Sequence, residues 1–226
     1  PETCDCGFFF DETSSLRKMV GDGGYVNPEE VAAVLIEPIQ GEGGYQFPSD
    51  AFMNEVASIT EEYDIPLVVD EVQSGLGRTG EWWGSDHYAI EPDVIASAKS
   101  ARVGATISRE EVFPEEKSRL SSTWGAGDIV ASAQGVFTID AIEEYDLLDN
   151  AVERGRQMKE LLRDEALDGV VDVRGKGLML AAEFESEKVR DAVQEEAFSR
   201  GFLIMGCGKR TMRLLPPLDV TAREIE

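Results

Sequence analysis

The chain has 226 residues, 42% of them hydrophobic, so it can bury the core of one or two domains. Asp and Glu number 45 against 21 Lys and Arg, a formal net charge of -24 at pH 7. A field of this sign repels phosphate backbones and anionic lipids, so we expect neither nucleic acid nor a membrane as a partner. The acids are dispersed along the chain, which is typical of the solvated surface of a salt-adapted, halophilic protein. A specific acidic binding patch is the alternative.

Cysteine usage indicates a reducing compartment, and we expect a cytoplasmic location. Cys4, Cys6 and Cys207 are too few and too uneven for a disulfide framework. With His87 as the single histidine, ligands for a zinc site are scarce, and no metal site is expected. No apolar run approaches the roughly 20 residues of a membrane span, and no secretory signal opens the chain.

Both ends of the sequence suggest a fragment or a partial chain. The first residue is Pro1 rather than Met, and the opening 28 residues lack a clear period. At the other end, Thr221 and Glu224 form a capping box that should open a helix, yet the sequence stops at Glu226.

The first half of the chain reads as alternating strands and helices. A β-branched, apolar run over 31–36 predicts a strand buried on both faces. Ser49 then begins a helical pattern, and a second apolar strand over 67–69 ends at Asp70. Further short strands are predicted at 94–96 and 103–108. Strand, helix, strand is the signature of a parallel sheet in an α/β fold.

The second half begins with a long helical passage over 128–166, broken near Asp146, where we place the domain boundary. We expect part of a large domain in residues 1–145 and a smaller, truncated α/β domain in 146–226. In the smaller domain the pattern predicts strands at 170–173, 178–184, 201–205 and 212–215, and a helix at 188–200.

Residues at two predicted strand ends could carry chemistry. Asp70 and Glu71 follow one apolar strand and Lys99 follows the next, and open α/β sheets bind ligands at the carboxyl ends of their strands. From position alone, a solvated strand-end acid is as acceptable an interpretation of Asp70 as a site residue, and a surface lysine is the favoured interpretation of Lys99.

Four motifs change that balance. The segments EPIQGEGG at 37–44, VVDEVQSGLGRTG at 68–80, PDVIASAKS at 92–100 and STWGAG at 122–127 occur in this order. Together they resemble the class III aminotransferases, pyridoxal-phosphate enzymes of fold type I, and 4-aminobutyrate aminotransferases in particular. The resemblance runs from about residue 28 to the end. It implies a partial large domain with a mostly parallel sheet, followed by a smaller C-terminal α/β domain.

The resemblance gives the candidate residues their roles. Lys99 matches the lysine that holds pyridoxal 5'-phosphate as an internal aldimine and, once released, moves the substrate proton. Asp70 matches the carboxylate facing the pyridine nitrogen, which favours the protonated ring. Val72 resembles the aliphatic residue packed on the ring, and Gln73 the side chain at the phenolic oxygen. Thr123 matches a residue that contacts the phosphate from the neighbouring subunit, which implies a homodimer with a shared active site.

Substrate recognition is assigned by the same resemblance. Glu37 and Arg213 resemble a switchable pair in which the arginine fork binds a substrate α-carboxylate or, when none is present, the glutamate. A static salt bridge is the alternative. For Arg78 we expect a loop-stabilising role.

The family resemblance implies transamination from an ω-amino acid, with 4-aminobutyrate as the leading donor and 2-oxoglutarate as the acceptor. Lysine 6-aminotransferase and acetylornithine or ornithine aminotransferase are the alternatives. A complete member of the family is about twice as long, and its N-terminal half supplies the main phosphate-binding donors. A non-catalytic fragment that needs this missing half therefore also stays open.

Overall fold

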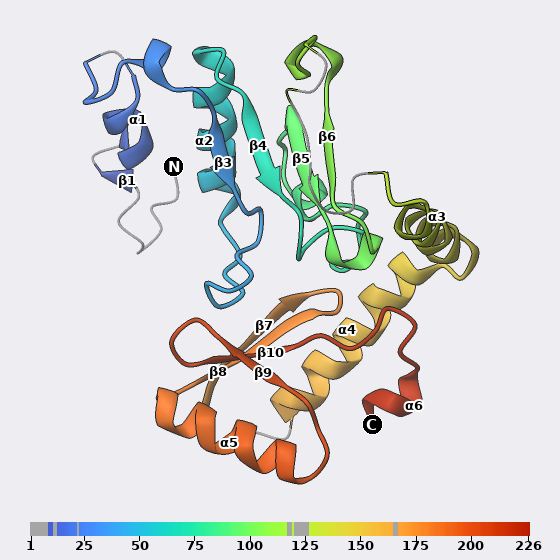
Figure 1. Cartoon of the computed structure of the whole chain (residues 1–226). Coiled ribbons are helices and arrows are strands. Elements are labelled where there is room, and N and C mark those ends of the chain that lie inside the picture. Colours follow the sequence, from blue (N-terminus) through green and yellow to red (C-terminus); the bar gives the residue numbers. More distant parts are fainter. Residues whose placement is uncertain (1–8, 11–12, 22, 117–118, 120–126, 165–166) are drawn as a thin grey trace.

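The computed structural model describes residues 9–10, 13–21, 23–116, 119, 127–164 and 167–226. Figure 1 shows two α/β units, one above the other: the upper unit contains a mostly parallel sheet and the lower unit an antiparallel sheet. The predicted α/β class is confirmed. At the N-terminal side, β1 (Phe9–Phe10) and β2 (Thr13–Ser14) form a short hairpin followed by α1 (Ser15–Met19), in a region where the sequence predicted no element.

The upper sheet has the strand order β3-β4-β5-β6. Its strands are β3 (Val34–Ile36), β4 (Leu67–Asp70), β5 (Val94–Ser97) and β6 (Ala105–Ser108). The first three strands run parallel, and β6 is an antiparallel edge strand. The sheet is therefore mostly parallel, as expected. The predicted strand over 31–36 is three residues too long, because only from Val34 onward does the backbone pair with β4.

Helix α2 (Asp50–Glu62) covers one face of this sheet (Figure 1). It begins where the Ser49 hydroxyl accepts a hydrogen bond from the Phe52 N–H. Its apolar stripe buries Val56 against Leu67 and Val69, with Ile95 packed beside them. This core fixes the register of the central strands, and so fixes where β4 and β5 end.

Two long helices connect the units: α3 (Ile129–Glu144) and α4 (Leu147–Asp164). The chain breaks between them as predicted, with Asp146 in the left-handed region at φ 50°. Helix α3 contacts the short turn Lys99–Ala101, whereas α4 contacts β7 of the lower sheet. The division into 1–145 and 146–226 stays a prediction.

The lower sheet is antiparallel, with the order β7-β8-β10-β9. Its strands are β7 (Val170–Lys176), β8 (Met179–Phe184), β9 (Met205–Cys207) and β10 (Thr211–Leu214), and α5 (Glu187–Ser199) and α6 (Ala222–Ile225) complete the unit. The strand predicted over 201–205 is wrong, because only Met205 of that stretch pairs with β10. The predicted capping box of Thr221 and Glu224 is confirmed at the start of α6.

The two faces of the lower sheet contact different partners. Phe184 and Ala182 pack with Val189 of α5, while Met179 and Ala181 pack against Ile39 and Tyr45 of the loop that follows β3. This loop therefore lies between the two sheets, below the carboxyl ends of the parallel strands in Figure 1.

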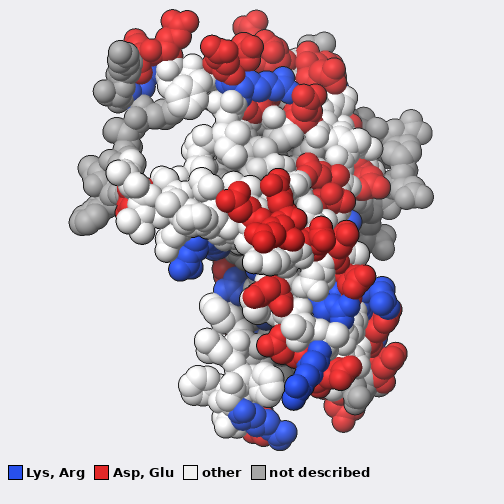
Figure 2. Space-filling view, turned by 90° about the vertical axis from the view of Figure 1, so that its right-hand side faces the viewer, with Lys and Arg blue, Asp and Glu red and all other residues white. Residues whose placement is uncertain are grey.

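One face of the molecule shows how its charged side chains are distributed. Figure 2 shows Asp and Glu scattered over both units, with Lys and Arg interspersed among them. Among the described residues, no helix combines the length and apolar composition that crossing a bilayer requires.

Candidate active site

Asp70 and Lys99 lie at neighbouring strand ends. Asp70 is the last residue of β4 and pairs with Ala96 of β5, and the N–H of the next residue, Glu71, donates to the Ala96 carbonyl at 2.9 Å. Lys99 opens the turn just after β5, with a left-handed backbone at φ 49°. Left-handed backbone is unusual for a residue with a side chain and is concentrated at functional sites.

The Asp70 carboxylate has one oxygen engaged. Oδ1 accepts the Val72 N–H at 3.0 Å, and within the described residues Oδ2 has no hydrogen-bond partner. Val72 is half-buried beside it. The carboxylate is thus oriented by the backbone while retaining the capacity to accept another proton donor.

The adjacent acid, Glu71, has a different role. Its side chain is fully buried and accepts the N–H groups of Gly84 at 2.9 Å and Ser85 at 2.7 Å and the hydroxyl of Ser74 at 2.5 Å. Glu71 lies just beyond β4, and its contacts with Ser74, Gly84 and Ser85 fix the loop, whereas Asp70 remains half-buried at the strand end.

Arg213 reaches the same region from β10, and the carboxylate it contacts is that of Glu42, not that of Glu37. The expected Glu37–Arg213 pair is therefore wrong in this structure. Glu37 instead accepts the Gly41 N–H at 2.7 Å, which closes the start of the loop. The glycine-rich loop carries the backbone past Glu37 and leaves Glu42 nearest to Arg213.

The two members of this ion pair are held unequally. The Arg213 side chain is 11% exposed, whereas that of Glu42 is 71% exposed. The hydrogen bond from Arg213 lowers the pKa of Glu42, and the charge of Lys99 acts in the same direction. Burial opposes protonation of Arg213, but the hydrogen bond and charge of Glu42 outweigh it and raise the pKa of Arg213. The arginine is anchored and the glutamate can leave toward solvent.

Gln73 and Tyr45 surround this pair. The Gln73 amide donates to Glu42 at 3.3 Å, and the Tyr45 hydroxyl donates to the Gln73 carbonyl oxygen at 3.5 Å. Gln73 occupies the space that a Cβ on Gly41 would take, 2.3 Å from its Nε2. A side chain at position 41 would therefore displace the end of the Gln73 side chain from its place beside Glu42.

Two further sequence predictions concern neighbouring segments. Arg78 donates to the Pro216 carbonyl at 2.6 Å and its own carbonyl accepts the Leu178 N–H at 3.0 Å, so it links the glycine-rich loop to the C-terminal unit. Burial lowers the pKa of Arg78. Thr123 lies outside the described residues.

Sequence reasoning missed Glu42, Tyr45 and Arg174. Glu42 could have been noticed as the charged residue inside a glycine-rich loop. The other two have no local signal, because their contacts join segments far apart in the sequence.

The gathered site contains an amine, a partly open carboxylate, an amide and an arginine–glutamate pair. The sequence also matches the class III aminotransferase family over residues 11–226. The chain belongs to this family. This class III aminotransferase chain is 36% identical to the acetylornithine aminotransferase of Prochlorococcus marinus, covering 97% of this chain and 54% of that protein. It spans about half the length of the curated relatives that it matches.

Solved structures agree with this assignment. The lysine aminotransferase from M. tuberculosis in the internal aldimine form superposes with a TM-score of 0.78 at 32% identity, over 88% of this chain and 47% of that one. An ornithine aminotransferase from Toxoplasma gondii gives a TM-score of 0.81 at 32% identity, over 88% of this chain and 49% of that one. The expected fold type I architecture is thereby confirmed.

Pyridoxal phosphate is the cofactor of this family, and the described residues fit its ring and aldehyde. The open Oδ2 of Asp70 suits a protonated ring nitrogen, and the Lys99 amine at the next strand end suits the aldehyde. Val72, two residues after Asp70, is a half-buried apolar side chain.

Proposed function

We propose that the protein is a pyridoxal-phosphate-dependent transaminase acting on the terminal amine of a diamino acid such as acetylornithine, ornithine or lysine. The observation that carries this proposal is the placement of Lys99 and Asp70 at adjacent strand ends, with the charge of Lys99 acting on Glu42 of the Glu42–Arg213 pair. The relatives named above favour this donor class over 4-aminobutyrate. The proposed acceptor is 2-oxoglutarate, and the proposed location is the cytoplasm.

The bound cofactor would supply an aldehyde for the amine and an electron-withdrawing ring. Lys99 would hold it covalently and then move a proton at the reacting carbon through its Nζ atom. Asp70 would keep the proton on the ring nitrogen through Oδ2. Val72 would pack on the ring, and Gln73 would hold Glu42 and orient the phenolic oxygen.

Arg213 would distinguish the two substrates of the reaction. When a terminal amine reacts, no carboxylate lies at Arg213, and Glu42 neutralises its charge. When 2-oxoglutarate binds, its α-carboxylate would take both guanidinium donors and displace the exposed Glu42. We propose Glu42, in place of Glu37, as the glutamate of this exchange.

A homodimer is part of this proposal. Helix α3, which directly follows the segment containing Thr123, exposes large apolar side chains: Ile129 is 83% exposed and Phe137 69%. Exposed apolar patches of this kind mark association surfaces. Light scattering of the purified protein would test the dimer, and a monomer in the presence of pyridoxal phosphate would contradict it.

The central test is reduction of the pyridoxal-phosphate-treated protein with borohydride, followed by peptide mapping. We expect a stable adduct on Lys99, and Lys159, whose amine donates to the Gly175 carbonyl, serves as the internal control. Amine transfer would then be compared for acetylornithine, ornithine, lysine and 4-aminobutyrate. An adduct elsewhere would refute the catalytic assignment, and preference for 4-aminobutyrate would refute the donor class. Failure to form an adduct unless a complementary N-terminal half is added would favour the fragment hypothesis.

A further inference from the structure

The backbone of the loop that carries Glu42 contains a strained turn. Gly44 and Tyr45 both have positive φ, at 109° and 53°. For Tyr45, which has a Cβ, left-handed backbone costs about 1–2 kcal/mol. Such a turn persists only where its surroundings hold it in place.

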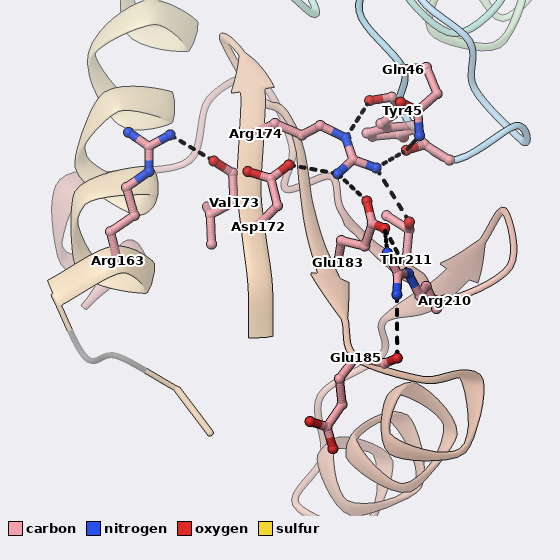
Figure 3. A network of polar contacts seen from close by, with 11 residues as sticks. Tyr45, Gln46, Arg163, Asp172, Val173, Arg174, Glu183, Glu185, Arg210 and Thr211 are labelled. Carbon is pink, nitrogen blue, oxygen red and sulfur yellow. Dashed lines mark hydrogen bonds and ion pairs between the residues drawn. The ribbon is translucent and has the colours of Figure 1, made fainter. Parts of the chain in front are cut away.

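Arg174 of β7 holds this turn (Figure 3). Its Nε donates to the Tyr45 carbonyl at 2.9 Å and its Nη2 to the Gly44 carbonyl at 2.7 Å. On the other edge of the guanidinium, Nη1 contacts Asp172 at 2.7 Å and Glu183 at 2.6 Å. The side chain is 16% exposed. The planar fork therefore connects two consecutive loop carbonyls to carboxylates of the antiparallel sheet.

The same loop positions the substrate pair. The Glu42 carbonyl accepts the Gly208 N–H at 2.7 Å, and the Tyr45 ring is fully buried against Met179 and Ala181 of β8. Arg213 is fixed separately, because β10 pairs with β8 and β9 on its two sides. The relative position of Glu42 and Arg213 thus depends on how firmly the 41–46 loop is held on the sheet.

We propose that Arg174 is a positioning residue for substrate selection: it holds the 41–46 loop on the antiparallel sheet and so keeps Glu42 against Arg213. This inference rests on the proposed function of the Glu42–Arg213 pair. Loosening the loop should lower the local concentration of the Glu42 carboxylate at Arg213. An incoming dicarboxylate then meets less competition.

The test is a double-mutant cycle that combines substitutions of Glu42 and Arg174. Its readout is the affinity for glutarate, measured by calorimetry with pyridoxal phosphate present. Glutarate is a dicarboxylate without an amino or keto group. Glu42→Gln should tighten glutarate binding by about 3- to 10-fold, since it removes the competitor. Arg174→Gln alone should tighten it by a similar or smaller factor, and should have no further effect in the Glu42→Gln background. Arg210→Gln is the matched control, because Arg210 contacts Glu183 at 2.8 Å from the same network without touching the loop.

Several outcomes would overturn the proposal. Equal effects of Arg174→Gln in both backgrounds, or an equal effect of Arg210→Gln, would show that Arg174 acts only on stability. If Arg174→Gln does not fold, Arg174→Lys replaces it in the cycle, because lysine retains the charge but not the planar fork. Arg174→Lys should change glutarate affinity in the same direction by a smaller factor. If Glu42→Gln tightens binding and neither Arg174 variant does, only the Arg174 inference fails. If Arg213→Gln leaves glutarate affinity unchanged, the proposed substrate site fails as well.

Discussion

The carboxylate of Glu42 contacts the guanidinium of Arg213 across 171 positions of the sequence, joining a loop of the parallel sheet to a strand of the antiparallel one. This pair places an exposed anion beside a largely buried cation, and Asp70 and Lys99 lie at the neighbouring ends of β4 and β5.

Replacing Glu42 by Gln should change substrate preference. We expect the KM for 2-oxoglutarate to fall by about 3- to 10-fold, because an uncharged amide competes poorly for Arg213, while the rate with terminal amines falls. Steady-state kinetics with each substrate varied separately would measure both effects. Glu37→Gln is the control, and a shift caused by Glu37→Gln but not by Glu42→Gln would restore Glu37 as the switching residue.

Replacing Asp70 by Asn should reduce chemistry more than cofactor binding. An amide does not stabilise the protonated ring nitrogen as a carboxylate does, so we expect kcat to fall by about 100-fold or more, the scale of losing one oriented electrostatic group. Stopped-flow half-reactions and a pyridoxal-phosphate titration would separate the two effects. Asp140→Asn, on the exposed surface of α3, is the control. A fall in cofactor affinity with kcat unchanged would contradict the assigned role.

Glu71→Gln should destabilise the protein although the shape of the side chain is preserved. The buried carboxylate accepts three hydrogen bonds, from the Ser74 hydroxyl and the N–H groups of Gly84 and Ser85. In glutamine one of the two oxygens becomes an NH2 group, which cannot accept a hydrogen bond from an N–H. We expect a loss of about 2–4 kcal/mol in the free energy of unfolding, measured by urea denaturation. The exposed Glu81→Gln should change stability little. Comparable stability of the two variants would mean that the loop over 72–85 does not depend on Glu71.

Gly155→Ala should destabilise the protein, although alanine is favoured over glycine in an isolated helix by about 1 kcal/mol. Helix α4 packs so closely on the turn before β8 that a Cβ at position 155 would lie 1.9 Å from the Gly177 carbonyl oxygen. We expect a net loss of about 1–3 kcal/mol from overpacking, seen as a lower Tm. Gly104→Ala, where nothing lies within 4 Å, should be nearly neutral. A higher Tm for Gly155→Ala would show that α4 readily shifts away.

His87 should make stability sensitive to pH. Burial lowers the pKa of this histidine in the folded state, with the charge of Lys176 acting in the same direction. The unfolded chain therefore binds more protons, and stability should fall as pH decreases through about 6.5. His87→Gln should remove this component between pH 5 and 7, measured by urea denaturation at each pH. An identical pH dependence in the variant would mean that carboxylates alone are responsible.

The sequence by itself determined the central strands of the parallel sheet and the positions at which they end. The apolar runs after Pro66 and Pro92 predict β4 and β5, and parallel neighbours end at the same edge, so local pattern places Asp70 and Lys99 at adjacent strand ends. Their proposed roles came from the motif resemblance. The predicted strands over 31–36 and 201–205 differ from the structure because hydrogen-bonded strand pairing, rather than hydrophobicity, sets where a strand begins. That pairing begins at Val34 and at Met205.

Only the tertiary structure decided which charged groups meet. Glu37 and Glu42 lie five positions apart in a glycine-rich segment, and its left-handed turn at Tyr45, held by Arg174, brings Glu42 to Arg213. Contacts with the 72–85 loop likewise bury Glu71, while Asp70 stays half-buried at the end of β4. Local propensity cannot specify such choices, because they depend on long-range contacts that form only when the two sheets pack together.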